Sequence, residues 1–203
     1  MPRTTRAGKR LLSGVEIEKL LDEVVAVAAY VEQRRAAEPL ASHIQLPKLP
    51  PILSESIVGL LLLNGAIPLP GVAAVIAVEP AGIAGDLFVT TPAGKVRVEV
   101  KGTTRGFTLF NAKDVTAPFV IWLDVGPLFR ISRKATVHVI PGPGDLGIVM
   151  GQRLTSATLA RRAFGSVIDV EVDLPRPNLA PGRASERARS GERTHSADGA
   201  VSA

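Results

Sequence analysis

The chain has 203 residues, a length that predicts one domain of ordinary size with room for a terminal tail. Lys and Arg together number 24 against 19 Asp and Glu, and the resulting net charge of +5 suits a polyanionic partner without requiring one. There is no cysteine, which excludes disulfides and cysteine-ligated zinc or iron–sulfur sites and makes a cytoplasmic location the simplest interpretation. The basic N-terminus leads into an acidic amphipathic stretch rather than an apolar one, so no signal peptide is expected.

The first expected helix begins at Ser13 and ends near Arg35. The segment Ser13-Gly-Val-Glu16 has the residue types of a capping box, in which each end satisfies a backbone N–H of the other. Apolar residues then recur at helical spacing: Ile17, Leu20, Leu21, Val24, Ala28 and Val31. This stripe predicts a helix that packs on the domain, and it leaves open a homodimer through the N-terminal helix.

The stretch from residue 57 to residue 78 is almost wholly apolar, which raises the question of a membrane span. Asn64, Gly65 and several prolines interrupt it, whereas a spanning helix needs about 20 uninterrupted residues. The stretch therefore predicts a buried helix with Ser54 as its N-cap and Asn64-Gly65 as its stop, followed by a strand over residues 72–79. No membrane partner is expected.

Alternating residues further along predict a β-hairpin, with strands at Asp86–Thr91 and Lys95–Lys101 around the turn Pro92-Ala-Gly94. A nearly continuous apolar run at Pro118–Val125 predicts a central strand that is covered on both faces. The remaining expected elements are strands at 135–140 and 167–174 and a helix at 154–164.

The folded domain is expected to span residues 13–174, between two unstructured ends. Residues 1–12 are expected to be a flexible N-terminus. From residue 175 the periodicity stops and Pro, Gly, Ser, Arg and Ala dominate, so residues 175–203 are expected to be a disordered tail.

Three charged side chains of the hairpin are the candidates for chemistry. Strand alternation places Glu99 and Lys101 on the same face, and Asp86 begins the partner strand, where it can lie near Glu99 across the turn. Two carboxylates brought together at low dielectric repel each other unless a cation neutralises them. Mg²⁺ prefers one or two carboxylates together with water and substrate phosphate. We therefore expect Mg²⁺, or Mn²⁺, at Asp86 and Glu99, with Lys101 placed to orient or deprotonate an attacking water.

The segments Gly85-Asp86 and Glu99-Val100-Lys101-Gly102 together resemble the motif of the PD-(D/E)XK nuclease superfamily. The order of a helix, a strand, an acid-bearing strand and an E-x-K strand is similar to that family, as is Lys113-Asp114 before an apolar strand. The match covers about residues 53–125. It departs from the family in having Gly85 for the motif's proline and only Thr103–Ala117 where the family has a helix. The resemblance implies an α/β fold: a restriction-endonuclease-like mixed β-sheet flanked by helices.

The resemblance also implies roles for individual residues. In that family the first acid and the Glu hold the divalent metal, the backbone carbonyl between Glu and Lys joins them, and a Glu of the preceding helix completes the site. The implied catalytic residues are Glu55, Asp86, Glu99 and Lys101, and the implied metal ligands are Asp86, Glu99 and Val100. In a nuclease, the candidates for contacts with nucleic acid are Thr103, Thr104, Arg105 and Lys113, which supply affinity rather than sequence choice.

Three function hypotheses are open. The first is a divalent-metal-dependent endonuclease that hydrolyses DNA phosphodiester bonds, in defence or DNA processing. The second is a non-catalytic module that keeps the nuclease fold to bind DNA or a protein. The third is a β-rich interaction domain that uses the apolar segment 57–78. Gly142–Gly147 matches G-x-G-x-x-G but does not run from a strand directly into a helix, the three histidines lack ligand spacing, and no serine-centred triad stands out.

Overall fold

The structure is a computed structural model and describes residues 10–45, 48–82, 84–104, 106–126, 134–161 and 167–174. Its helices are α1 (Gly14–Ala37), α2 (Pro51–Leu63), α3 (Ala112–Val115) and α4 (Ser156–Arg161), with a 3-10 helix η1 (Pro39–His43). Its strands are β1 (Ala77–Pro80), β2 (Leu87–Thr91), β3 (Gly94–Thr103), β4 (Phe107–Leu109), β5 (Phe119–Asp124), β6 (Lys134–Pro141), β7 (Arg153–Thr155) and β8 (Ile168–Asp173). Residues 1–9 of the expected flexible N-terminus and the expected tail 175–203 lie outside the described residues.

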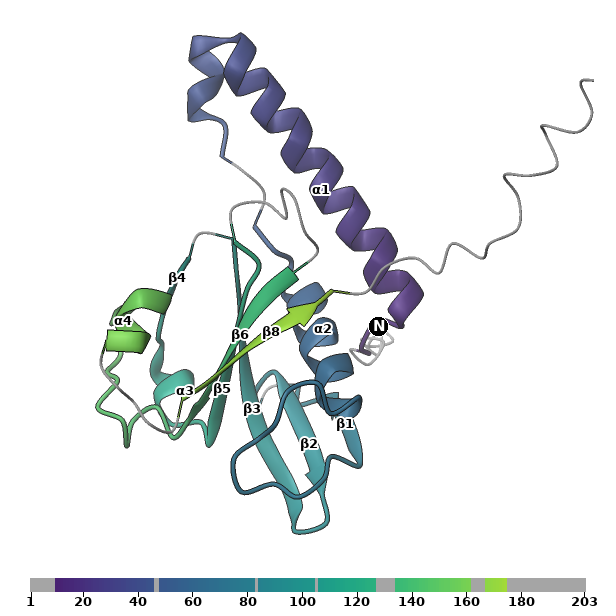
Figure 1. Ribbon diagram of the computed structural model, residues 1–203, viewed down its shortest axis with the longest axis vertical. Helices are drawn as coiled ribbons and strands as arrows, with labels where there is room; N and C mark the ends of the chain where they lie inside the picture. Colours follow the sequence, from purple (N-terminus) through teal and green to yellow (C-terminus); the bar gives the residue numbers. More distant parts are fainter. Residues whose placement is uncertain are drawn as a thin grey trace, which may run out of the picture.

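Six strands form one mixed sheet in the order β1-β2-β3-β5-β6-β8, and β4 pairs with β7 in a separate two-stranded sheet (Figure 1). Strands β3 and β5 run parallel, whereas the other neighbours in the large sheet are antiparallel. A parallel pair needs a crossover connection, and here the chain returns from β3 to β5 through β4 and α3. The predicted α/β class is therefore confirmed as a mixed sheet with helices.

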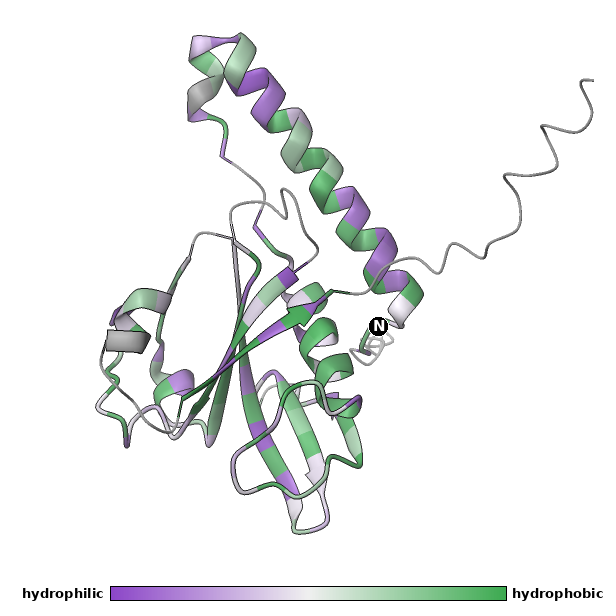
Figure 2. Ribbon diagram, viewed as in Figure 1, coloured by the Kyte–Doolittle hydropathy of each residue, from purple (hydrophilic) through white to green (hydrophobic). Residues whose placement is uncertain are grey.

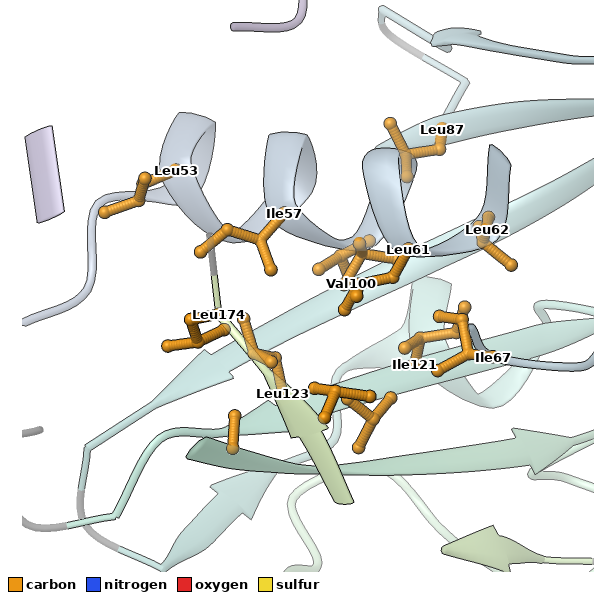
Figure 3. Packing of buried hydrophobic residues seen from close by; sticks show 14 of the residues in the cluster. Leu53, Ile57, Leu61, Leu62, Ile67, Leu87, Val100, Ile121, Leu123 and Leu174 are labelled. Carbon is orange, nitrogen blue, oxygen red and sulfur yellow. The ribbon is translucent and has the colours of Figure 1, made fainter. Parts of the chain in front are cut away.

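Helix α2 covers one face of the large sheet. Figure 3 shows its apolar side chains, among them Leu53 and Ile57, above Val100 of β3 and Ile121 of β5. Each side chain of this kind stabilises the fold by about 1.5–3 kcal/mol when it is fully buried. Because Val98 and Val100 face α2, strand alternation turns Glu99 and Lys101 to the opposite face, as the sequence predicts.

A second core lies on that opposite face and surrounds Trp122 of β5. Its other buried members are Phe110, Ala117, Val120, Ile140, Ile148, Leu154 and Leu159. Strand β5 therefore contributes to both cores, since Ile121 and Leu123 belong to the first and Val120 and Trp122 to the second. Its apolar run correctly predicts a strand that is covered on both faces.

Helix α1 begins at the predicted capping box. The Glu16 N–H donates to the Ser13 hydroxyl, and the Ser13 N–H donates to the Glu16 carboxylate. Ile17 and Leu21 of its first half join the core at α2. The second half extends away from the sheet towards η1 (Figure 1), and Figure 2 shows hydrophobic and hydrophilic bands along it. None of the helices in the described part of the chain is long and apolar enough to cross a membrane.

Three expected elements need correction. Helix α2 begins at Pro51, whose fixed φ suits a first helical turn, so Ser54 lies inside the helix and is not its N-cap. The strand expected over 72–79 is shorter and forms β1. The helix expected from Leu154 begins only at α4, because Leu154 pairs with Thr108 in the β4–β7 ladder.

The apolar segment 57–78 is buried in most of its helical part, whereas Leu63 and Ile76 further along are exposed. Its helical part lies against the sheet, and Ile57, Val58 and Leu62 are fully or almost fully buried. Ile67 and Leu69 are buried as well. The apolar surface that the third hypothesis requires is therefore limited to the part from Leu63 onwards.

Candidate active site

The hairpin of β2 and β3 brings Asp86 next to Glu99. Leu87 pairs with Val98 in the antiparallel ladder, so Asp86, one residue earlier, comes opposite Glu99. Leu87 and Val98 both belong to the core at α2, and alternation turns their neighbours Asp86 and Glu99 to the other face together. The two carboxylates therefore share one face of the sheet, and Asp86 lies near Glu99 as the sequence predicts.

A backbone contact holds Asp86 in place. The Val100 N–H donates a hydrogen bond of 2.8 Å to Asp86 Oδ2. The N–H and C=O of one strand residue point to the same side of the strand, as in the pairs of an antiparallel ladder that exchange both bonds. The Val100 carbonyl therefore points to the strand edge at which Asp86 lies, next to the last ladder pair of β2.

Glu99 is a buried carboxylate in an unfavourable environment. It is 3% exposed, and its Oε1 accepts no hydrogen bond within the described part of the chain. Arg97 Nε lies 3.9 Å from this oxygen, too far for a hydrogen bond. Burial raises the pKa of Glu99 from 4.5 to about 7, and the negative charge of Asp86 contributes to the rise, while Arg97 opposes it. An additional cation would relieve this environment.

Lys101 is held by an acid that comes from another element. Its Nζ lies 2.6 Å from Asp114 Oδ2, and Asp114 is 1% exposed. Asp114 belongs to α3, where its carboxylate also accepts the Asn111 N–H at 2.6 Å as part of a capping box. The ammonium of Lys101 is thus fixed on the same face of β3 as Glu99.

Gly85 leaves the space that the Glu99 carboxylate occupies. A Cβ at this position would lie 2.7 Å from Glu99 Oε1 and 3.0 Å from the Arg97 side chain. A contact as short as the first is essentially never found for a real Cβ atom. A side chain at residue 85 would therefore displace Glu99 or Arg97.

The structure groups some of the remaining predicted residues with this cluster and leaves others out. Lys113 lies on α3, and its charge lowers the pKa of Glu99, which places it near the cluster. Glu55 is buried in α2, on the other side of the sheet, so it is not grouped with Asp86 and Glu99. Arg105 lies outside the described residues.

The two threonines at the end of β3 differ in their surroundings. The Thr103 hydroxyl accepts from Trp122 Nε1 at 2.7 Å and donates to Asp124 Oδ1 at 3.4 Å, so it is engaged within the fold. Both threonines line a pocket of 340 Å³ together with Lys48 and Phe107. Because the Thr103 hydroxyl is already engaged, Thr104 is the better candidate of the two for a contact with an anionic ligand.

Two features on this face are not predicted from the sequence. The first is the role of Asp114, which the sequence indicates only through the family resemblance. The signal that could have identified it is the pattern Asn111-x-x-Asp114, the capping box that orients its side chain. The other feature is a hydrogen-bond network around the buried side chain of His138, whose partner Asp169 is exposed. Its Nδ1 lies 2.6 Å from Asp169 Oδ1, and its Nε2 lies 3.0 Å from Ser156 Oγ.

The His138 network has the order of a catalytic triad but a different environment. The Asp124 carboxylate lies 3.4 Å from Ser156 Oγ and accepts its hydrogen bond. If Ser156 attacked a substrate, the negative charge of Asp124 would repel the oxyanion that forms. Acyl transfer requires hydrogen-bond donors to stabilise that oxyanion. His138 is 1% exposed and packs on Trp122 with 4.6 Å between ring centroids. The network therefore supplies hydrogen-bond partners to the buried His138 imidazole.

The donor set of the hairpin fits a hard divalent cation. The described residues contain no group of three or more His, Cys, Asp or Glu that could hold a metal ion. Asp86 and Glu99 supply two carboxylates, and the Val100 carbonyl lies at the same edge. Mg²⁺ is commonly held by one or two carboxylates and keeps several waters. The buried Glu99 Oε1 without a hydrogen-bond donor is the oxygen that such a cation would satisfy.

Comparisons of the chain with protein-family models, with curated proteins and with solved structures found no match.

Proposed function

We propose that this protein is a divalent-metal-dependent nuclease with a restriction-endonuclease-like fold, and that it hydrolyses phosphodiester bonds of DNA. The observation that carries the proposal is the buried Glu99 carboxylate beside Asp86, whose pKa is raised to about 7 by burial and by the charge of Asp86. A structural ion pair would lower the pKa of a carboxyl rather than raise it. Two carboxylates in this arrangement suit a site that is completed by a cation.

The order of elements supports the same proposal. Helix α2 and strand β1 precede the hairpin, Asp86 immediately precedes β2, and the E-x-K residues lie on β3. Helix α3, although short, occupies the place between β3 and the parallel strand β5. This is the segment in which the sequence lacks a clear helix signal, and α3 brings Asp114 to Lys101.

Each residue of the cluster has a chemical role in the proposed reaction. Asp86, Glu99 and the Val100 carbonyl would hold Mg²⁺ or Mn²⁺, which supplies Lewis acidity towards the phosphate and lowers the pKa of a bound water. Lys101 orients the attacking water, and Asp114 keeps the ammonium in place. Lys113 on α3 and Lys48 beside Thr104 would contact the phosphate backbone of the substrate.

A cleavage assay tests the proposal. Supercoiled plasmid is incubated with the full chain in Mg²⁺, in Mn²⁺ and in a chelator, with single-stranded DNA and RNA as further substrates. Cleavage is expected with either metal and not with the chelator, and Asp86→Asn, Glu99→Gln and Lys101→Ala should each remove most of it. Cleavage that survives all three substitutions would contradict the assignment.

The same sheet offers matched controls. Glu79 and Lys95 form an exposed ion pair between β1 and β3. Glu79→Gln and Lys95→Ala remove the same charges as Glu99→Gln and Lys101→Ala at a site with no proposed role. Both controls are expected to cleave at the rate of the unsubstituted protein, since surface ion pairs contribute little to stability.

A non-catalytic module of the same fold is the second candidate. It is favoured by the pairing of two members of the cluster, because Asp86 already accepts the Val100 N–H and Lys101 is paired with Asp114. A metal-binding measurement distinguishes a non-catalytic module with a metal site from a cluster of charged residues that binds no metal. Mg²⁺ or Ca²⁺ is expected to raise the unfolding temperature of the unsubstituted protein and not that of Asp86→Asn. Metal binding and DNA binding without cleavage would favour the non-catalytic module.

A further inference from the structure

A row of exposed side chains runs along α1, on a side that the domain does not cover. In chain order it contains Lys19, Glu23, Val27, Tyr30, Arg34 and the C-cap residue Glu38. At about 100° per residue, these side chains fall within a stripe about 100° wide. Val27 and Tyr30 at its centre are 50% and 63% exposed. None of the four charged side chains forms an ion pair with another described residue.

The charges in this row are ordered so that two copies of the row, aligned in opposite directions, bring opposite charges together. From the N-terminal end, the row reads positive, negative, apolar, apolar, positive, negative. A second copy laid alongside in the opposite direction places a negative charge next to each positive one. A parallel copy would instead place like charges together, which is unfavourable at close range.

We propose that this face of α1 is an interface between two copies of the chain, with the two helices antiparallel. In the register that follows, Val27 lies against Tyr30 of the second copy, and Glu23 lies against Arg34 of the second copy. Lys19 lies against Glu38 of the second copy. Twofold symmetry repeats each contact, so the closed dimer has an apolar centre with two ion pairs on either side of it.

The position of α1 in the fold leaves room for such a partner. Its N-terminal half packs on α2 through Ile17 and Leu21, and its C-terminal half extends away from the sheet with η1 (Figure 1). The 3-10 helix η1 covers one side of that outer half. Ala28 and Val31 of α1 and Ala41 of η1 are buried there. At about 100° per residue, the proposed row lies beside this buried side. Figure 2 shows hydrophobic residues among hydrophilic ones along the helix. Apolar contacts at the centre contribute affinity, and the flanking charges select the direction.

Sedimentation equilibrium of the full chain tests the interface by charge reversal. The unsubstituted protein is expected to be a dimer, and Arg34→Glu is expected to weaken the dimer by about tenfold or more, since both symmetry-related pairs become repulsive. Glu23→Arg combined with Arg34→Glu restores opposite charges and should restore the dimer. Arg35→Glu is the matched control, because Arg35 is exposed next to Arg34 but lies off the row.

Crosslinking tests the direction of the helices. The chain has no cysteine, so Lys19→Cys and Glu38→Cys each introduce a single thiol. When the two variants are mixed and treated with a short bismaleimide, the antiparallel register predicts a product that joins one chain of each kind. Products that join like chains would overturn the register. A monomer at all concentrations, or a dimer that Arg34→Glu leaves unchanged, would overturn the interface.

Discussion

The Lys101 ammonium lies 2.6 Å from the Asp114 carboxylate, and the two residues come from elements that are joined only through β4 and a turn. Asp114 is buried and also accepts the Asn111 N–H, so it has little freedom to move. Lys101 is therefore a positioned cation rather than a flexible surface side chain. In the proposed nuclease, Asp114 is a positioning residue that acts through Lys101.

Replacement of Asp114 by Asn is expected to slow DNA cleavage by roughly tenfold to a hundredfold, the range expected when a reacting group shifts by about an ångström. The Asn side chain still accepts the Asn111 N–H but no longer attracts Lys101. The pH dependence of the rate should shift as well, because the charge beside Lys101 and Glu99 changes. Cleavage rates between about pH 5 and pH 9 measure both effects. Asp173→Asn, at an exposed position on β8, is the control, and an unchanged rate and pH profile in Asp114→Asn would remove Asp114 from the site.

Stability is expected to fall with rising pH because of Glu99. Its pKa is about 7 in the folded protein against an ordinary value of 4.5, so the folded state binds this proton more tightly than the unfolded state does. The folded state therefore has its full stability from this group below pH 4.5 and loses it as the pH rises through 7. Urea unfolding of the unsubstituted protein and of Glu99→Gln without metal measures the effect. The difference in free energy of unfolding between the two proteins should change between pH 4.5 and pH 7. A difference that stays constant over this range would contradict the raised pKa of Glu99.

Replacement of Gly85 by Ala is expected to disturb the carboxylate cluster specifically. The new Cβ would lie 2.7 Å from Glu99 Oε1, so the carboxylate must move. We expect a loss of about 1–3 kcal/mol in the free energy of unfolding and a weaker response of the unfolding temperature to Mg²⁺. Gly14→Ala is the control, because a Cβ there has open space around it. Unchanged stability and metal response in Gly85→Ala would mean that Glu99 moves without cost.

The His138 network is expected to stabilise the fold without taking part in chemistry. Replacement of His138 by Phe removes the hydrogen bonds to Asp169 and Ser156 and should cost about 1–3 kcal/mol. Trp122 is the only tryptophan of the chain and contacts the His138 ring, so its fluorescence reports unfolding directly. Cleavage of DNA should continue in this variant. A fluorophosphonate that labels Ser156 would show instead that the serine is an activated nucleophile.

Local patterns were sufficient to predict the hairpin that carries Asp86, Glu99 and Lys101. The capping box at Ser13, the hairpin turn and the alternation along β3 each depend on residues close in sequence, and the structure confirms them. Strand β4 and the start of α4 were missed, because the short strands β4 and β7 are defined only by their mutual pairing. The strand predicted over 72–79 begins too early, because the ladder with β2 starts only at Ala77.

The sequence alone is sufficient to predict that Glu99 and Lys101 share one face of β3 and that Asp86 lies near Glu99, because alternation and turn geometry are local properties of the backbone. Only the tertiary structure decided the state of these groups. Burial raises the pKa of Glu99, Asp114 on α3 holds Lys101, and α2 with its Glu55 lies on the opposite side of the sheet. Burial and ion pairing depend on which distant segments pack together, and no short-range pattern contains that information.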